Sequence, residues 1–238
     1  MRGAGCTWND ITDRDFDGRV ARTASRPIPS GQVTVKGAVI WMCLQALIAF
    51  AILLTFKPLA ILLGIGSLAL VAIYPFAKRF TWWPQVFLGL AFNWGAFLAW
   101  TAITGTLSWA PLFLYLAGIA WTLFYDTVYA HQDKEDDALI GIKSTARLFG
   151  DETPRFLLIF LVLSVVFLAA AIITALIDSA NVLALTLALG GPWAFGWHLS
   201  WQMRRLDTEN PDICNMIFKS NRDAGLILAL FLAISLLL

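Results

Sequence analysis

Long apolar stretches alternate with short charged segments along this chain, and most stretches have the length of a membrane-spanning helix. The stretches cover residues 37–56, 58–77, 84–104, 109–128, 156–177, 181–203 and 223–238. A helix needs about 20 apolar residues to cross a bilayer, and only the last stretch is clearly shorter. The pattern predicts an all-α fold, a polytopic transmembrane bundle of about seven complete spans embedded in the lipid bilayer.

Composition excludes several other classes of protein. Apolar residues make up 59% of the 238 residues and charged residues only 14%, which is typical of integral membrane proteins. The net charge of +1 comes without any basic stripe, so no nucleic-acid partner is expected. Cys6, Cys43 and Cys214 lie far apart and predict neither a disulfide framework nor a zinc site. No obligate protein partner is evident from the sequence.

The basic residues predict how the spans are oriented. Every lysine and arginine except Lys57 lies before residue 37 or in the segments 78–83, 129–155 and 204–222. Strict alternation of the spans places all of these segments on the same side of the membrane. By the positive-inside rule we expect that side to be cytoplasmic.

The first of these segments carries a regular stripe of polar side chains. Asn9, Asp13 and Asp17 recur every four residues, so a helix would place them on one face, while Asp15 points the other way. Clustered carboxylates near a membrane repel one another unless cations compensate. The stripe therefore predicts a cation-binding surface.

A second acidic segment repeats the design four spans later. Asp126, Asp133 and Asp137 are spaced by seven and four residues, which again predicts one helical face. Hard oxygen ligands suit Mg²⁺, which usually completes its coordination shell with water and substrate phosphate oxygens. Two such clusters on one side of the membrane favour a shared Mg²⁺ and diphosphate site over two solvated acidic loops.

The motifs resemble those of the UbiA superfamily of intramembrane prenyltransferases. NDITDRDFD (residues 9–17) and DTVYAHQDKEDD (residues 126–137) are similar to its two aspartate-rich motifs. Three further segments resemble the 4-hydroxybenzoate polyprenyltransferase branch, which serves ubiquinone biosynthesis: RTASRPIPSG (22–31), YPFAKRFTWWPQ (74–85) and DDALIGIKSTARLFG (136–150). The resemblance covers nearly the whole chain and implies one UbiA-like membrane domain over residues 1–238.

The resemblance also implies a role for individual residues. The expected Mg²⁺ ligands are Asn9, Asp10, Asp13, Asp17, Asp133 and Asp137. The expected catalytic residues are Asp13, Asp17, Asp133, Asp137 and Arg79. The expected substrate-binding residues are Lys78, Arg79, Arg22, Asn93, Asp126 and Lys143, with Arg26 and Arg147 as further candidates. Aromatic residues including Trp82, Trp83, Phe87, Phe92 and Trp94 are candidates for lining a channel for the prenyl tail.

The activity implied is transfer of a polyprenyl group from polyprenyl diphosphate to the ring of 4-hydroxybenzoate, ortho to its hydroxyl. Mg²⁺ would neutralise charge on the departing diphosphate. Another acceptor, such as haem, a naphthoate, a homogentisate or a chlorophyllide, is the nearer alternative. An ion-coupled transporter is the other alternative, although its acidic groups would be expected mid-span rather than at helix ends. The expected location is a bacterial inner membrane, with the mitochondrial inner membrane as the alternative.

The start of the chain departs from the family pattern. The family normally has nine spans and places its first aspartate motif after the second, whereas Asn9 follows only eight residues. Residues 1–8 are predicted to be the last turns of that second helix. We therefore expect a chain truncated at its N-terminus relative to the family, through a misplaced gene start or because it is a fragment.

Overall fold

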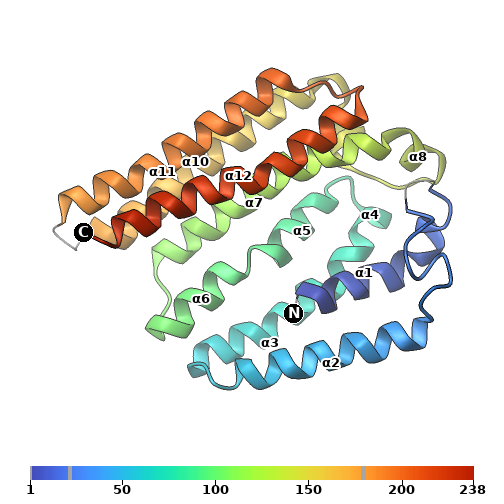
Figure 1. Cartoon of the computed structure of the whole chain (residues 1–238), viewed down its shortest axis with the longest axis horizontal. Helices are drawn as coiled ribbons and strands as arrows, with labels where there is room; N and C mark the ends of the chain where they lie inside the picture. The colour runs from blue at the N-terminus through green and yellow to red at the C-terminus, as the bar shows by residue number, and fades with distance from the viewer. Residues whose placement is uncertain (1, 21–22, 178–180) are drawn as a thin grey trace.

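The computed structural model describes residues 2–20, 23–177 and 181–238, and these residues form helices, turns and loops without any strand (Figure 1). The α-helices are α1 Arg2–Asp17, α2 Val35–Leu53, α3 Pro58–Ile73, α4 Ala77–Phe80, α5 Pro84–Phe92, α6 Gly95–Thr104, α7 Trp109–Ala130, α8 Lys134–Leu139, α9 Thr145–Phe149, α10 Thr153–Leu176, α11 Val182–Arg205 and α12 Pro211–Ser235. Short 3-10 helices are η1 Tyr74–Phe76, η2 His131–Asp133 and η3 Gly150–Glu152. The predicted all-α class is confirmed.

The described residues include six helical segments that are long and apolar enough to cross a membrane. They are Val35–Leu53, Pro58–Phe80, Pro84–Thr104, Trp109–Leu139, Thr145–Leu176 and Val182–Arg205. These segments match the first six predicted stretches, and the chain is an integral membrane protein.

The seventh predicted stretch corresponds to only part of a helix. Helix α12 begins at Pro211 rather than at residue 223, and it does not belong to the six apolar segments. Its first half carries Asp212, Lys219, Arg222 and Asp223, which lower its hydropathy. The prediction of a short terminal span was therefore wrong about where this helix starts, because apolarity alone does not mark the polar turns that extend it.

One predicted span is broken in its middle. The stretch 84–104 forms two helices, α5 and α6, separated at Asn93 and Trp94. The side-chain amide of Asn93 donates hydrogen bonds to the Gly89 carbonyl at 2.8 Å and to Thr122 Oγ1 at 2.9 Å. An asparagine side chain that bonds the backbone competes with continuation of the helix, and the following Gly95 is a weak helix former. The break therefore lies where local chemistry opposes the helix.

The tightest packing lies in the C-terminal half. Helix α7 packs extensively against α10, and α11 packs against both α10 and α12, as Figure 1 shows. Their shared core includes Phe124, Leu157, Phe195, Leu199 and Ile217, which are all buried. Between membrane helices such packing stabilises the bundle through close van der Waals contact rather than through removal of apolar surface from water.

The N-terminal half forms a looser group of helices beside this core. Helix α1 packs on α2 and lies close to η1, while α3 contacts α5 and α6. Large apolar side chains such as Ile40, Trp41 and Leu47 on α2 are exposed. A bilayer accommodates such a surface because its hydrocarbon is as apolar as these side chains. Figure 1 shows that α4, α8 and the carboxyl end of α1 gather at one end of the bundle.

Candidate active site

The two acidic segments line one pocket of about 340 Å³ at that end of the bundle. Its polar lining comes from α1, from the loop after it, from α4 and α5, and from the segment that runs from α7 to Ser144. The aspartates that line it are Asp13, Asp17, Asp126, Asp133 and Asp137. The structure therefore brings together two segments that are more than 100 residues apart in the sequence.

The first predicted stripe is observed on α1. Asn9, Asp13 and Asp17 all line the pocket, and Asp13 and Asp17 are buried with exposed fractions of 2% and 8%. Asp15 lies on the opposite face, and its side chain is 78% exposed. The four-residue spacing thus predicted correctly which carboxylates share a face.

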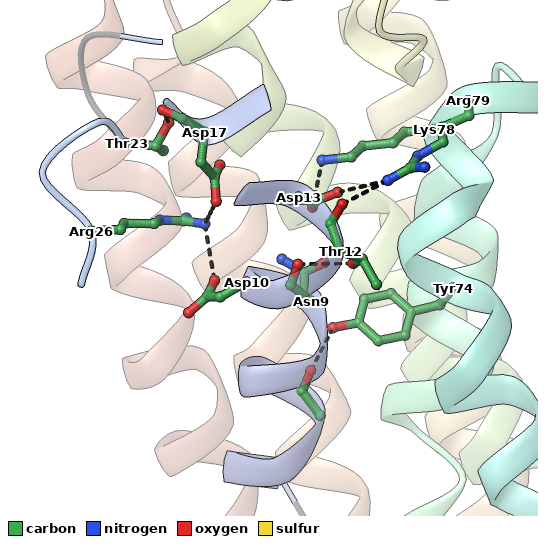
Figure 2. Close-up of polar contacts among 11 residues, drawn as sticks. Asn9, Asp10, Thr12, Asp13, Asp17, Thr23, Arg26, Tyr74, Lys78 and Arg79 are labelled. Carbon is green, nitrogen blue, oxygen red and sulfur yellow. Dashed lines mark hydrogen bonds and ion pairs between the residues drawn. The ribbon is translucent and has the colours of Figure 1, made fainter. Parts of the chain in front are cut away.

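Asp13 is the most buried of these groups and contacts two basic residues (Figure 2). The Lys78 ammonium donates to Asp13 Oδ2 at 2.6 Å, and the Arg79 guanidinium lies 3.8 Å from Oδ1. Burial raises the pKa of Asp13, and the positive charge of Lys78 opposes that rise. The Oδ1 atom is buried without a hydrogen-bond partner. Burying an acceptor atom such as this Oδ1 costs free energy unless a cation or a hydrogen-bond donor contacts it.

Arg26 returns from the loop after α1 to that helix. Its guanidinium donates to Asp17 Oδ2 at 2.8 Å and to Asp10 Oδ1 at 3.2 Å, as Figure 2 shows. The Thr23 hydroxyl donates to the Asp17 carbonyl at 2.9 Å and fixes the turn that brings Arg26 back. Asp10 was expected to be a metal ligand, but it does not line the pocket, and burial raises its pKa.

The second acidic cluster does not lie on one face of a single helix, as its spacing had predicted. Asp126 lies on α7, Asp133 in the 3-10 helix η2, and Asp137 on α8, so no single regular helix carries all three. The 3-10 turn tightens the chain between them. All three nevertheless line the pocket, because the change of helix type still turns this segment toward α1.

Three of the expected basic residues line the pocket, whereas Arg79 and Arg147 do not. Lys78, Lys143 and Arg26 are lining residues. Arg79 lies outside the lining: its guanidinium donates to the Thr12 carbonyl at 2.8 Å and rests 5.2 Å from the centroid of the Phe16 ring. Within the structure it supports α1 rather than facing the pocket.

Asn93 is a further expected residue that lies outside the pocket. Asn93, expected to bind substrate, instead bonds Gly89 and Thr122 inside the bundle, as described above. Polar side chains within spans usually find partners in this way. Arg22, also expected to bind substrate, lies outside the described residues.

A family model described as "UbiA prenyltransferase family" matches residues 1–237. The chain belongs to the UbiA prenyltransferase family. Its relatives include the bovine (Bos taurus) "4-hydroxybenzoate polyprenyltransferase, mitochondrial", 47% identical over 231 residues, and the human protein of that name, 46% identical. Each alignment covers 97% of this chain and 60% of the relative. The chain thus spans about 60% of the length of these relatives.

Solved structures of UbiA homologues show the same fold. The apo structure of a UbiA homolog from Aeropyrum pernix K1 matches with a TM-score of 0.80 at 22% identity, covering 99% of this chain and 85% of that one. A UbiA homolog from Archaeoglobus fulgidus, bound to DMAPP and Mg²⁺, matches with a TM-score of 0.70 at 23% identity, covering 98% and 81%. The expected UbiA-like bundle is confirmed.

The side chains that line the acidic pocket are of the chemical type that binds magnesium. Among the described residues, no three acidic, histidine or cysteine side chains converge closely enough to hold a metal as they stand. The donors are nevertheless hard oxygens from two helical segments, and the buried Oδ1 of Asp13 has no hydrogen-bond partner. Oxygen ligands of this kind, sharing the ion with phosphate, are those that Mg²⁺ prefers.

A larger apolar pocket of about 750 Å³ adjoins the acidic one. It is lined by α1, α2, α3, α5 and α6, and it shares Tyr74 and Leu88 with the acidic pocket. Phe92 and Trp94, two of the aromatic residues expected to line a tail channel, belong to its wall. Trp82, Trp83 and Phe87 line neither pocket.

Sequence reasoning missed Gln85 as a site residue. It is the second residue of α5, is only 4% exposed, and lines the acidic pocket. The available signal was a polar amide directly after Pro84 at the start of an apolar stretch. Such a residue is costly to bury unless it has partners, so it marks a polar contact within the bundle.

Proposed function

We propose that this chain transfers a polyprenyl group from polyprenyl diphosphate to the ring of 4-hydroxybenzoate, with Mg²⁺ as cofactor, in ubiquinone biosynthesis. The observation that carries the proposal is the convergence of both aspartate clusters on one pocket that opens into an apolar one. A diphosphate with a long hydrocarbon tail has the same two-part character. The names of relatives at 46–47% identity support 4-hydroxybenzoate as acceptor.

The acidic residues would hold the cofactor. We assign Asn9, Asp13, Asp17, Asp133 and Asp137 as the Mg²⁺-binding set, with Asp126 as a supporting member. Bound Mg²⁺ supplies charge neutralisation for the departing diphosphate. Asp10 supports the set indirectly through its contact with Arg26.

The basic residues would bind and orient the diphosphate. Lys78, Arg26 and Lys143 line the same pocket as the carboxylates and can donate to phosphate oxygens. In the reaction the bond between the allylic carbon and the diphosphate oxygen breaks, and its electron pair leaves with the diphosphate. A new carbon–carbon bond forms ortho to the acceptor hydroxyl, and the ring then loses the proton at that carbon.

The decisive assay uses membranes that contain this chain. Radiolabelled 4-hydroxybenzoate and a polyprenyl diphosphate should yield the prenylated acid only when Mg²⁺ is present. Haem, naphthoate, homogentisate and chlorophyllide acceptors should give no product, and product from one of them alone would transfer the assignment to that acceptor. Ion flux in proteoliposomes without any prenyl transfer would support the transporter instead.

The relatives reported above are named as mitochondrial proteins, so the expected bacterial inner membrane gains no support from them. We therefore propose the mitochondrial inner membrane, with the acidic pocket on the side that carries the basic segments. Protease accessibility of the 134–144 segment, or thiol-reagent labelling of a cysteine introduced into it, tests that side in sealed, oriented vesicles.

A further inference from the structure

The side chain of Gln85 joins three helices next to the acidic pocket. Its Oε1 atom accepts a hydrogen bond from the backbone N–H of Thr145, the first residue of α9, at 3.2 Å. The same side chain hydrogen-bonds the carboxyl group of Asp126 on α7. Because Gln85 itself lies on α5, this one amide connects α5, α7 and α9.

The contact with Thr145 fixes which way the amide points. A glutamine amide has one acceptor oxygen and one NH₂ group that donates. Since the oxygen faces the Thr145 N–H, the NH₂ group is directed to Asp126, whose carboxyl oxygen can accept from it. The two ends of the Gln85 amide are therefore both engaged by the protein.

A second hydrogen bond strengthens the same junction. The hydroxyls of Thr127 and Thr145 lie 2.7 Å apart, and both residues are fully buried. Thr127 follows Asp126 on α7, and Thr145 follows Ser144, which lines the pocket beside Lys143. The junction therefore fixes the segment that carries Lys143 and Ser144 against the helix that carries Asp126.

We propose that Gln85 is a positioning residue for the transfer reaction, holding the Asp126 carboxylate toward the pocket and the Lys143–Ser144 segment beside it. The inference rests on the proposed function. Gln85 acts through Asp126 and Thr145, because its own acceptor and donor are already engaged by them. A buried hydrogen bond holds both groups in one orientation, because turning either group away leaves a buried polar atom unsatisfied.

Few other side chains could make both contacts from this position. Asparagine is shorter by one methylene and would not span from α5 to both partners. Glutamate would keep the acceptor for the Thr145 N–H but would bring a second carboxylate against Asp126. Methionine keeps the length and flexibility of glutamine without either hydrogen bond.

A double-mutant cycle tests whether Gln85 works through Asp126. Gln85→Met should lower kcat about 10- to 100-fold, the size expected when a buried polar group loses its hydrogen-bond partner, with a smaller change in KM for the polyprenyl diphosphate. In the Asp126→Asn background the same substitution should cost less than about threefold, because the group that it positions is already altered. Equal costs in both backgrounds would overturn the proposal.

Gln202 provides a matched control on α11. It is also a fully buried glutamine, and its amide donates to Ser220 Oγ at 2.7 Å, but it does not line the pocket. Gln202→Met should leave kcat per folded protein within about twofold of the parent. If Gln85→Met does not fold, Gln85→Glu replaces it: it keeps the acceptor for the Thr145 N–H but puts a second carboxyl group against Asp126, so kcat should fall, and an unchanged kcat would overturn the proposal.

Hydrogen exchange gives a readout that does not depend on activity. The Thr145 amide should exchange at least about tenfold faster in Gln85→Met than in the parent, whereas in Gln202→Met it should not change. Unchanged exchange in Gln85→Met would overturn the bridging role. A parent protein without prenyl transfer would instead overturn the proposed function, and the exchange experiment would still decide whether Gln85 forms the bridge.

Discussion

The Lys78 ammonium lies 2.6 Å from Asp13 Oδ2 and joins α4 to α1 at the wall of the acidic pocket. Asp13 is almost fully buried, which raises the pKa of its carboxyl group, and the positive charge of Lys78 opposes that rise. A buried ion pair of this kind contributes modestly as a pair, but removing one partner leaves the other uncompensated.

Lys78→Met should lower the free energy of unfolding by about 3 kcal/mol, because Asp13 then loses its closest cation. Added Mg²⁺ should restore part of this loss by occupying the same charged pocket. Unfolding in detergent with and without Mg²⁺ measures both effects. Lys134→Met is the control, since its partner Glu209 is 76% exposed, and its cost should stay below about 1 kcal/mol. Equal losses in the two variants would contradict this prediction.

Asp13→Asn and Asp133→Asn should each abolish prenyl transfer while the protein remains in the membrane. Both residues line the pocket, and the neutral amide is a poorer Mg²⁺ ligand than a carboxylate. Asp15→Asn is a matched control on α1, because Asp15 lies on the exposed face. Normal turnover in both pocket variants would remove the metal assignment.

The prediction of the first cluster succeeded because it needed only local geometry. A four-residue spacing fixes which side chains share a helical face, and α1 is a regular helix through Asn9, Asp13 and Asp17. The same reasoning was less accurate for Asp126, Asp133 and Asp137. The helix changes to a 3-10 turn at η2, which spacing alone does not reveal.

Contacts between helices were the part that sequence reasoning could not supply. Arg79 and Asn93 were both expected to bind substrate, yet their side chains bond Thr12 and Thr122, which are distant from them in the sequence. The polar bridge made by Gln85 was missed for the same reason. Composition and periodicity predict which side chains need a partner, but only the packing of α1, α5 and α7 determines which partner they find.

Arg26→Gln should raise KM for the polyprenyl diphosphate about tenfold, with a smaller effect on kcat. The guanidinium contacts Asp10 and Asp17 and lines the pocket, so its loss removes a donor for phosphate and leaves Asp17 without its cation. Steady-state kinetics at saturating Mg²⁺ measures the split. Arg14→Gln, an exposed change on the same helix, should leave KM unaltered. A fall in kcat at constant KM would contradict the role of Arg26 in binding the diphosphate.

Ala91→Phe should shift preference toward shorter prenyl diphosphates. Ala91 lines the apolar pocket from α5, and a phenyl ring there occupies volume that a long tail would need. Competition between a short and a long polyprenyl diphosphate gives the ratio of their kcat/KM values. Ala99→Phe on α6 is the control, since Ala99 is exposed and lines neither pocket. An unchanged ratio in Ala91→Phe would show that the prenyl tail does not occupy the apolar pocket.

Tyr74 and Leu88 belong to the walls of both pockets, so the polar and apolar spaces meet at these two side chains. An amphiphile that occupies both spaces must place the junction between its head and tail at that boundary. Every such molecule, whatever its tail length, therefore presents the same bond to the carboxylates. Under the proposed function, the head of a prenyl diphosphate would set its position in the two pockets, so diphosphates of different tail length would all bind in one register.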